Sequence, residues 1–195
     1  VVGYAGSMGL PNALDTLLDA MKRLQTEPQQ PPGRPIALVM VGGGHERDRL
    51  AERVRTEGLA NVQMLPPIPK AQIPAFLAEI DIAYIGWQRV PIYRFGIAPN
   101  KLMDYMMARC AVLHAVEAGN DPVAESGCGL TVAPESATAV ADGLRRLGAL
   151  HHVERLDVRE PTGELHLGCR AAWRAATSAS ASSSAAYPAR AVRAK

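Results

Sequence analysis

The hydrophobic pattern of the first 150 residues changes repeatedly between two kinds of segment. Short runs of adjacent apolar residues predict buried β-strands, and segments whose apolar residues recur every three or four positions predict helices with one buried face. The predicted strands are residues 1–5, 35–41, 61–65, 80–85, 111–114 and 129–132. The predicted helices are residues 11–25, 45–57, 71–78, 99–108, 122–126 and 136–150.

This alternation predicts an α/β fold with a doubly wound, Rossmann-like parallel sheet. Strands that are apolar on both faces need helices on both faces, and right-handed crossovers place the helices there. In such folds ligands bind beyond the carboxyl ends of the strands, near the point where the strand order reverses. The loops that follow the strands are therefore the candidate sites of chemistry.

Residues 151–195 differ from the rest and are predicted to form a disordered or irregular tail. Residues 171–186 are a low-complexity Ala/Ser segment, with too little apolar surface to offset the entropy lost on ordering. Residues 1–150 contain 14 Lys/Arg and 15 Asp/Glu, whereas residues 151–195 contain 7 and 4. We therefore predict one domain over residues 1–150. The alternatives for the tail are a segment that folds on a partner and a frameshifted gene end.

The composition argues against several classes of protein. A net charge of +2 and an aromatic content of 5% do not suit a nucleic-acid binder. Three widely spaced cysteines without a CxxC pair indicate a reducing cytoplasm rather than a disulfide framework. The sequence shows no apolar run of bilayer length and no secretory leader, and its five histidines lack the spacing of metal ligands. These features predict a cytoplasmic protein without a metal site.

The chain opens directly on a predicted core strand, residues 1–5, with no lead-in segment and no initiator methionine. We therefore expect it to be a piece of a longer protein.

The first candidate site is the loop after the first predicted strand, GSMGLPN. A loop of small residues before a helix offers free backbone N–H groups and the positive end of the helix dipole to an anion. Gly3, Gly6 and Gly9 form GxxGxxG rather than the dinucleotide fingerprint GxGxxG, and the second strand ends in Gly42–His45 instead of an acid. The loop therefore indicates an anion site other than one for NAD, with an ordinary tight turn as the alternative.

The second candidate site is the stretch 94-RFGIAPNKLMDYMMARCAVLH-114. Gly96 permits a close approach of backbone to a ligand, and Pro99 suits the start of a helix. Lys101 would then lie at the helix start, beside Asn100, where an ammonium can meet a phosphate. Asp104 would share the face of Lys101 one turn later and could accept the hydroxyls of a ribose. The alternative is an exposed helix with a Lys101–Asp104 ion pair.

The remainder of this predicted helix is apolar almost all round. Its apolar residues are Leu102, Met103, Tyr105, Met106 and Met107. We expect them to be buried, with the methionines in the core.

Five ordered blocks resemble one known family. They are VVGYAGSMGLPNALDTLLDAM, LVMVGGGHERDRL, NVQMLPPIPKAQIPAFLAEIDIAYI, FGIAPNKLMDYMMARCAVLH and EAGNDPVAESGCGLTV. The chain resembles the C-terminal, donor-binding half of family 4 retaining glycosyltransferases, which have the GT-B fold, and among them the enzymes that make bacterial surface polysaccharides. The resemblance covers residues 1–150. It implies metal-independent transfer of a sugar from a UDP-sugar, which is a substrate, so that no cofactor is expected.

The resemblance also implies roles for individual residues. Lys101 and Asp104 are the predicted catalytic residues, and Asp104 matches the second Glu of the family's Glu-x7-Glu motif, the ribose ligand. The predicted donor-binding residues are Gly6, Ser7, Gly9, Asn12, Pro67, Arg94, Gly96, Ile97, Asn100, Lys101 and Asp104. Pro67 would border the nucleobase. Glu117, Asn120 and Asp121 are candidates for contacts with the sugar, or else an ordinary loop.

The chain departs from the family pattern at four places. The first Glu of the motif has no counterpart, because Phe95 stands nine residues before Asp104. Ser7 and Met8 occupy the region where the family has Arg and Lys, and Arg109 replaces a usual Gly. Neutralisation of the diphosphate must therefore depend on Lys101, Arg94 and backbone N–H groups.

The resemblance predicts a nucleotide-sugar as partner, an absent N-terminal domain that holds a lipid-linked or polysaccharide acceptor, and no nucleic acid. The full-length protein would lie in the cytoplasm or peripherally at the inner face of the cytoplasmic membrane. The alternatives are a nucleotide-sugar epimerase of the same fold and a non-catalytic nucleotide-sugar-binding module.

Overall fold

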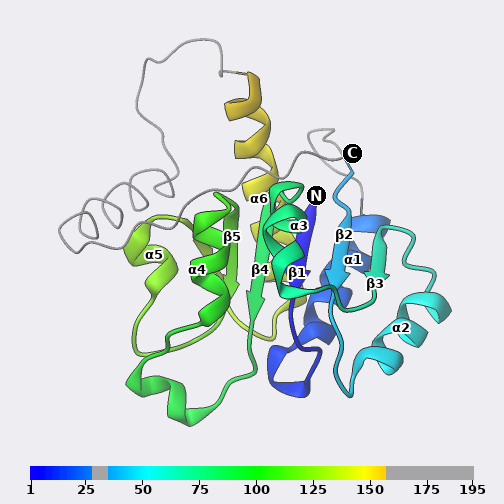
Figure 1. Ribbon diagram of the computed structural model, residues 1–195, viewed down its shortest axis with the longest axis horizontal. Helices are drawn as coiled ribbons and strands as arrows, with labels where there is room; N and C mark the ends of the chain where they lie inside the picture. Colours follow the sequence, from blue (N-terminus) through cyan, green and yellow to red (C-terminus); the bar gives the residue numbers. More distant parts are fainter. Residues whose placement is uncertain (28–34, 157–195) are drawn as a thin grey trace.

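The computed structural model describes residues 1–27 and 35–156 (Figure 1). The predicted tail therefore lies outside the described residues from residue 157 onward. The last helix was expected to end at residue 150 and continues to Leu156.

The six predicted strands form one parallel sheet, which confirms the fold class. Its strands are β1 (Val2–Ala5), β2 (Leu38–Val41), β3 (Val62–Leu65), β4 (Ile82–Gly86), β5 (Ala111–Ala115) and β6 (Gly129–Thr131). Their order across the sheet is β3-β2-β1-β4-β5-β6, with parallel pairing throughout. The order reverses between β1 and β4, so the expected binding crevice lies at the carboxyl ends of these two neighbouring strands.

Helices cover both faces of the sheet (Figure 1). They are α1 (Leu14–Thr26), α2 (Arg47–Thr56), α3 (Ile73–Ala78), α4 (Asn100–Met107), α5 (Pro122–Ser126) and α6 (Ala137–Leu156). One buried cluster joins α1, α2 and α6 to the sheet, and a second joins α3, α4 and α5 to the other face. Alternation along β4 explains the two clusters, because Tyr84 points into the first and Ile85 into the second.

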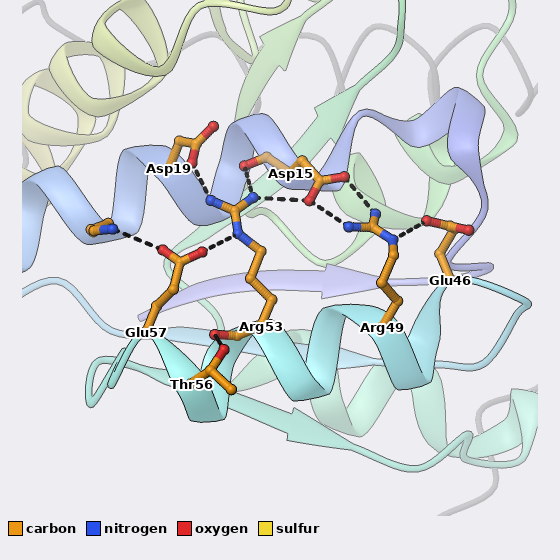
Figure 2. A network of polar contacts seen from close by, with 8 residues as sticks. Asp15, Asp19, Glu46, Arg49, Arg53, Thr56 and Glu57 are labelled. Atoms are coloured by element: carbon orange, nitrogen blue, oxygen red, sulfur yellow. Dashed lines mark hydrogen bonds and ion pairs between the residues drawn. The ribbon is translucent and has the colours of Figure 1, made fainter.

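A network of ion pairs connects the polar surfaces of α1 and α2 (Figure 2). Arg53 lies at its centre, with Nη1 2.9 Å from Asp15 and Nε 2.6 Å from Glu57, and it also pairs with Asp19. Arg49 makes two further bonds to Asp15, of 3.0 and 2.6 Å. Hydrogen bonds from Arg49 and Arg53 hold the pKa of Asp15 below its usual range. The network therefore fixes α2 against α1, next to the loops that precede both helices.

Two turns were not expected from the sequence. Leu10–Asn12 forms a 3₁₀ turn, and Ala13 takes a left-handed conformation with a φ of 46°, so that α1 begins at Leu14 instead of residue 11. Pro91–Phe95 forms a second 3₁₀ turn between β4 and α4. Both turns lie at the carboxyl edge of the sheet.

The prediction that the apolar residues of α4 are all buried is wrong for two methionines. Leu102 and Tyr105 are buried, but the side chains of Met103 and Met107 are 64% and 71% exposed. The helix packs only one face on the sheet, and a spacing of four residues places both methionines together on the opposite face.

Candidate functional site

The loop after β1 packs directly against the loop after β2. Its backbone N–H groups at Gly6 and Met8 donate to the carbonyls of Val41 and Gly43, at 3.0 and 2.6 Å. Gly42 has a φ of +147°, and a methyl group there would lie 1.9 Å from the Gly6 carbonyl oxygen. A side chain at residue 42 would therefore force the two loops apart. This contact gives the physical reason for the glycines after β2, which the sequence had offered only as evidence against NAD.

Lys101 reaches from the first turn of α4 across to the loop after β1. Its Nζ lies 3.0 Å from the hydroxyl of Tyr4 and 3.4 Å from Oδ1 of Asn12. A methyl group on Gly6 would lie 2.6 Å from Cε of Lys101, so the absence of a side chain at residue 6 makes room for the lysine. Three predicted site residues, Gly6, Asn12 and Lys101, are thus brought together at the point where the strand order reverses.

The Lys101 ammonium has no carboxylate partner in the part of the chain that the structure describes. The ion pair with Asp104 considered from the sequence does not form, and the Asp104 side chain is exposed. Burial lowers the pKa of Lys101 to about 8. A partly buried cation whose only polar neighbours are uncharged is a favourable place for an anion to bind.

A second pair of loops is joined by one side-chain amide. Asn120, after β5, accepts a bond of 2.7 Å from the Ile97 N–H and donates one of 3.0 Å to the Ile97 carbonyl. The Gly119 N–H donates to the Tyr93 carbonyl at 2.9 Å. Gly96, with a φ of +105°, completes the turn into α4. Asn120 therefore sets the position of the segment that leads into the lysine's helix.

The other polar residues after β5 have structural partners. Oδ1 of Asp121 accepts bonds from the Ala124 N–H at 3.0 Å and from Thr131 at 2.8 Å, so Asp121 caps α5. Glu117 pairs with Arg89 at 3.0 Å. His114, which the sequence did not single out, is buried at the end of β5 with Nδ1 3.1 Å from Oγ1 of Thr131, and burial lowers its pKa. These contacts favour the loop alternative for Glu117 and Asp121.

The remaining predicted site residues lie around these contacts. The Ser7 carbonyl accepts bonds from Tyr4 and Asn12, and Gly9 lies beside His45. Pro67 packs against Gly43. Asn100 and Asp104 are exposed on α4.

Arg94 does not join the contacts of Lys101. Its guanidinium lies 4.6 Å from the centre of the Phe95 ring. It borders an open groove of about 420 Å³ between the second 3₁₀ turn and the loop after β5. The groove is lined by Arg89, Val90, Pro91, Arg94, Glu117, Ala118 and Gly119.

Two features are absent from residues 1–27 and 35–156. No three His, Cys, Asp or Glu side chains there are grouped so that they could hold a metal ion. In the same residues, no helix has the length and apolarity needed to cross a membrane.

Residues 1–149 match the family model described as glycosyl transferases group 1. The chain belongs to this family. WcaI of Escherichia coli (strain K12), whose name assigns it to colanic acid biosynthesis as a glycosyl transferase, is 27% identical to this group 1 chain over 150 residues. The match covers 75% of this chain and 35% of WcaI, so the chain spans about a third of that relative.

Several solved structures share the fold of this group 1 chain. Alr3699/HepE of Anabaena, crystallised with UDP-glucose, has a TM-score of 0.62 and 16% identity, and the match covers 92% of this chain and 43% of HepE. The C-terminal domain of LpcC, a group 1 protein of Francisella tularensis, has a TM-score of 0.57 and 20% identity, with coverage of 80% and 76%. At these identities the likeness concerns the fold alone.

Proposed function

We propose that residues 1–150 are the donor-binding domain of a glycosyltransferase and bind a UDP-sugar at the carboxyl edge of β1 and β4. The observation that carries this proposal is the Lys101 ammonium, which lies on the glycine loop without an acidic partner in the described residues. Family membership and the UDP and UDP-glucose complexes of the Anabaena neighbour support it.

In the proposed reaction, Lys101 stabilises the leaving group. Cleavage of the anomeric C–O bond leaves negative charge on the departing nucleoside diphosphate. A fixed cation and the N–H groups at the start of α4 lower the free energy of that charge in the transition state. Asp104 lies one turn after Asn100 and is exposed, and its carboxylate accepts hydrogen bonds from the ribose hydroxyls. The proposal includes retention at the anomeric carbon and requires neither a metal ion nor a cofactor besides the donor substrate.

The acceptor belongs to the part of the protein that this chain does not include. The chain spans 35% of its E. coli relative, and transfer needs donor and acceptor held together in reactive geometry. We propose a lipid-linked or polysaccharide acceptor held by an N-terminal domain, as in surface-polysaccharide synthesis. The chain alone should bind the donor without transferring the sugar. Formation of glycosylated lipid by this chain from labelled UDP-glucose and a membrane lipid extract would contradict this division.

Donor binding can be tested by calorimetric titration of UDP into the chain. Lys101→Met and Asp104→Ala should each weaken binding by about 1.5–3 kcal/mol, because each removes a charge-assisted hydrogen bond. Asp48→Ala, on a side chain of α2 that is 95% exposed, is the matched control and should leave binding unchanged. Unchanged affinity in both site variants would remove the proposed donor site.

The alternatives make different predictions for the full-length protein. An epimerase would convert a UDP-sugar without any acceptor, and a non-catalytic module would bind the UDP-sugar without converting it. Product analysis with and without acceptor lipid distinguishes these outcomes from transfer.

A further inference from the structure

We infer that Tyr4 and Asn12 are positioning residues that hold the Lys101 ammonium over Gly6 in a charged form, and that the donor diphosphate supplies the counter-ion that no carboxylate of the described residues provides. The inference rests on the proposed function and extends it, because it makes donor binding depend on the protonation of one lysine.

Four groups close a ring of hydrogen bonds in which each donor and acceptor can be assigned. The single hydroxyl proton of Tyr4 is donated to the Ser7 carbonyl, so the oxygen presents a lone pair to Nζ of Lys101, 3.0 Å away. Nδ2 of Asn12 donates to the same carbonyl at 3.0 Å, which turns Oδ1 toward Lys101 at 3.4 Å. An ammonium has three N–H donors, and this ring uses two of them. The third remains for a ligand.

The ring stabilises a positive charge without neutralising it. Both acceptors are uncharged, and Nζ lies 4.3 Å from the centre of the Tyr4 ring, within the range of a cation–π contact. Removing the Tyr4 hydroxyl would therefore disfavour the charged form of the lysine.

Among residues 1–27 and 35–156, the titratable groups around Lys101 do not supply a competing charge. Tyr4 on β1 and Tyr105 on α4 have pKa values raised by burial, so both hydroxyls stay neutral. Asp104, on the lysine's own helix, is exposed and forms no ion pair with Lys101, and His45 of the loop after β2 lies against Gly9. With a pKa of about 8, Lys101 is charged at neutral pH and loses its proton as the pH rises toward 9.

The first experiment needs no ligand. The sequence contains four lysines, Lys22, Lys70, Lys101 and Lys195, so their side-chain NMR signals can be followed separately through a pH titration. Lys101 should titrate near pH 8, and Tyr4→Phe should lower that midpoint by about one pH unit, because the ammonium loses an acceptor. Asn12→Asp should raise it, because a carboxylate replaces the amide oxygen.

The matched control is Tyr105→Phe. That hydroxyl accepts a bond from the Ala5 N–H at 3.5 Å and makes no hydrogen bond to Lys101, so the midpoint should not move. An unchanged Lys101 midpoint in Tyr4→Phe, or an equal shift in both tyrosine variants, would overturn the positioning role.

The second experiment measures the affinity for UDP-glucose from about pH 7 to about pH 9 by calorimetry, in buffers of different ionisation enthalpy. If only the charged lysine binds, affinity should fall about tenfold over this range, with proton uptake on binding near pH 8. Tyr4→Phe should shift this fall to lower pH, whereas a general loss of structure would weaken binding equally at every pH. Lys101→Arg keeps its charge throughout and should show a flat profile.

The outcomes separate the two proposals. If the chain binds no UDP-glucose at any pH, the proposed donor function fails, and the lysine titration still decides the positioning role. If it binds with the same affinity from pH 7 to 9 and takes up no proton, the donor function stands and the protonation coupling is wrong.

Discussion

The two halves of the sheet hold their carboxyl-edge loops by different means. In the half built on β1–β3, the two loops touch through their backbones at Gly6 and Gly42. The ion-pair network around Arg53 connects helices α1 and α2 of this half (Figure 2). In the half built on β4–β6, the amide of Asn120 joins the loops. The first contact is made by backbone alone, whereas the second combines a backbone contact at Gly119 with two hydrogen bonds from the side chain of Asn120.

The second half also exposes more apolar surface next to its loops. The side chains of Ile92 and Phe95 are 62% and 73% exposed, and Met103 and Met107 of α4 are exposed as well. Lys101 belongs to this half in sequence but makes its contacts in the other. The candidate site therefore lies between a closely packed loop contact at Gly6 and Gly42 and a contact that the Asn120 side chain helps to hold.

The largest loss of stability is expected when a methyl group is added at the backbone contact between Gly6 and Gly42. Gly42→Ala should lower the free energy of unfolding by about 3 kcal/mol or more, because it combines a strained φ with a 1.9 Å clash against backbone. Gly119→Ala in the other half also meets a carbonyl, that of Arg94, at 2.1 Å, but Gly119 does not have the positive φ of Gly42, so we expect about 1–2 kcal/mol. Urea denaturation measures both.

Gly58→Ala is the control for backbone strain alone, since its φ is +62° and a methyl group there would meet nothing within 4 Å. It should cost about 1 kcal/mol. If Gly119→Ala costs as much as Gly42→Ala, the loop contacts of the two halves are equally rigid.

A smaller effect is expected from Asn120→Ala, which leaves the N–H and the carbonyl of Ile97 without their partner. The cost should be about 2 kcal/mol, with faster amide exchange at residues 93–97 and unchanged exchange in the loop after β1. Gln72→Ala, on an exposed side chain of the same half, should change neither quantity. Faster exchange in both loops would show that the halves do not open independently.

The ion-pair network around Arg53 should contribute less to the free energy of unfolding than the loop contacts do. Arg53→Met should lower the free energy of unfolding by about 1 kcal/mol at neutral pH and low salt, and less at high salt. Arg55→Met, in an exposed pair with Glu52, is the control and should stay within about 0.5 kcal/mol.

The same network predicts that the stability of the fold decreases at acid pH. The folded state lowers the pKa of Asp15, so its contribution is complete above the ordinary value of 3.8 and is lost as the pH falls through the lowered folded value. Asp15→Asn should flatten this part of the stability profile. An unchanged slope below about pH 4 in that variant would mean that other carboxylates control acid unfolding.

The smallest effect is expected at the exposed methionines. Met103→Gln and Met107→Gln should each change stability by less than about 0.5 kcal/mol, whereas Leu102→Ala on the buried face should cost about 2–5 kcal/mol. A thermal denaturation series measures all three. A large loss at either methionine would place that side chain in a packed contact that the described residues do not contain.

The type and order of the strands and helices, and with them the class of fold, could be predicted from the sequence. The strands are mostly short apolar runs, and the longer helices have apolar residues at helical spacing. Such patterns arise from burial, which the local sequence reports directly. The pairing of a glycine loop after β1 with a polar first turn on α4 was also predictable, because parallel strands bring their carboxyl ends to one edge.

Three features depend on how the chain folds: which face of α4 is buried, where α1 begins and what Lys101 contacts. Met103 and Met107 look like core residues until the sheet covers only one side of their helix. The partners of Lys101, Tyr4 and Asn12, lie 97 and 89 residues away in the chain. The partners of Glu117 and Asp121, which are Arg89 and Thr131, were likewise not visible in the sequence. The local pattern determines whether a segment forms a strand or a helix. The charge state and the partners of a side chain depend on residues that only folding brings near it.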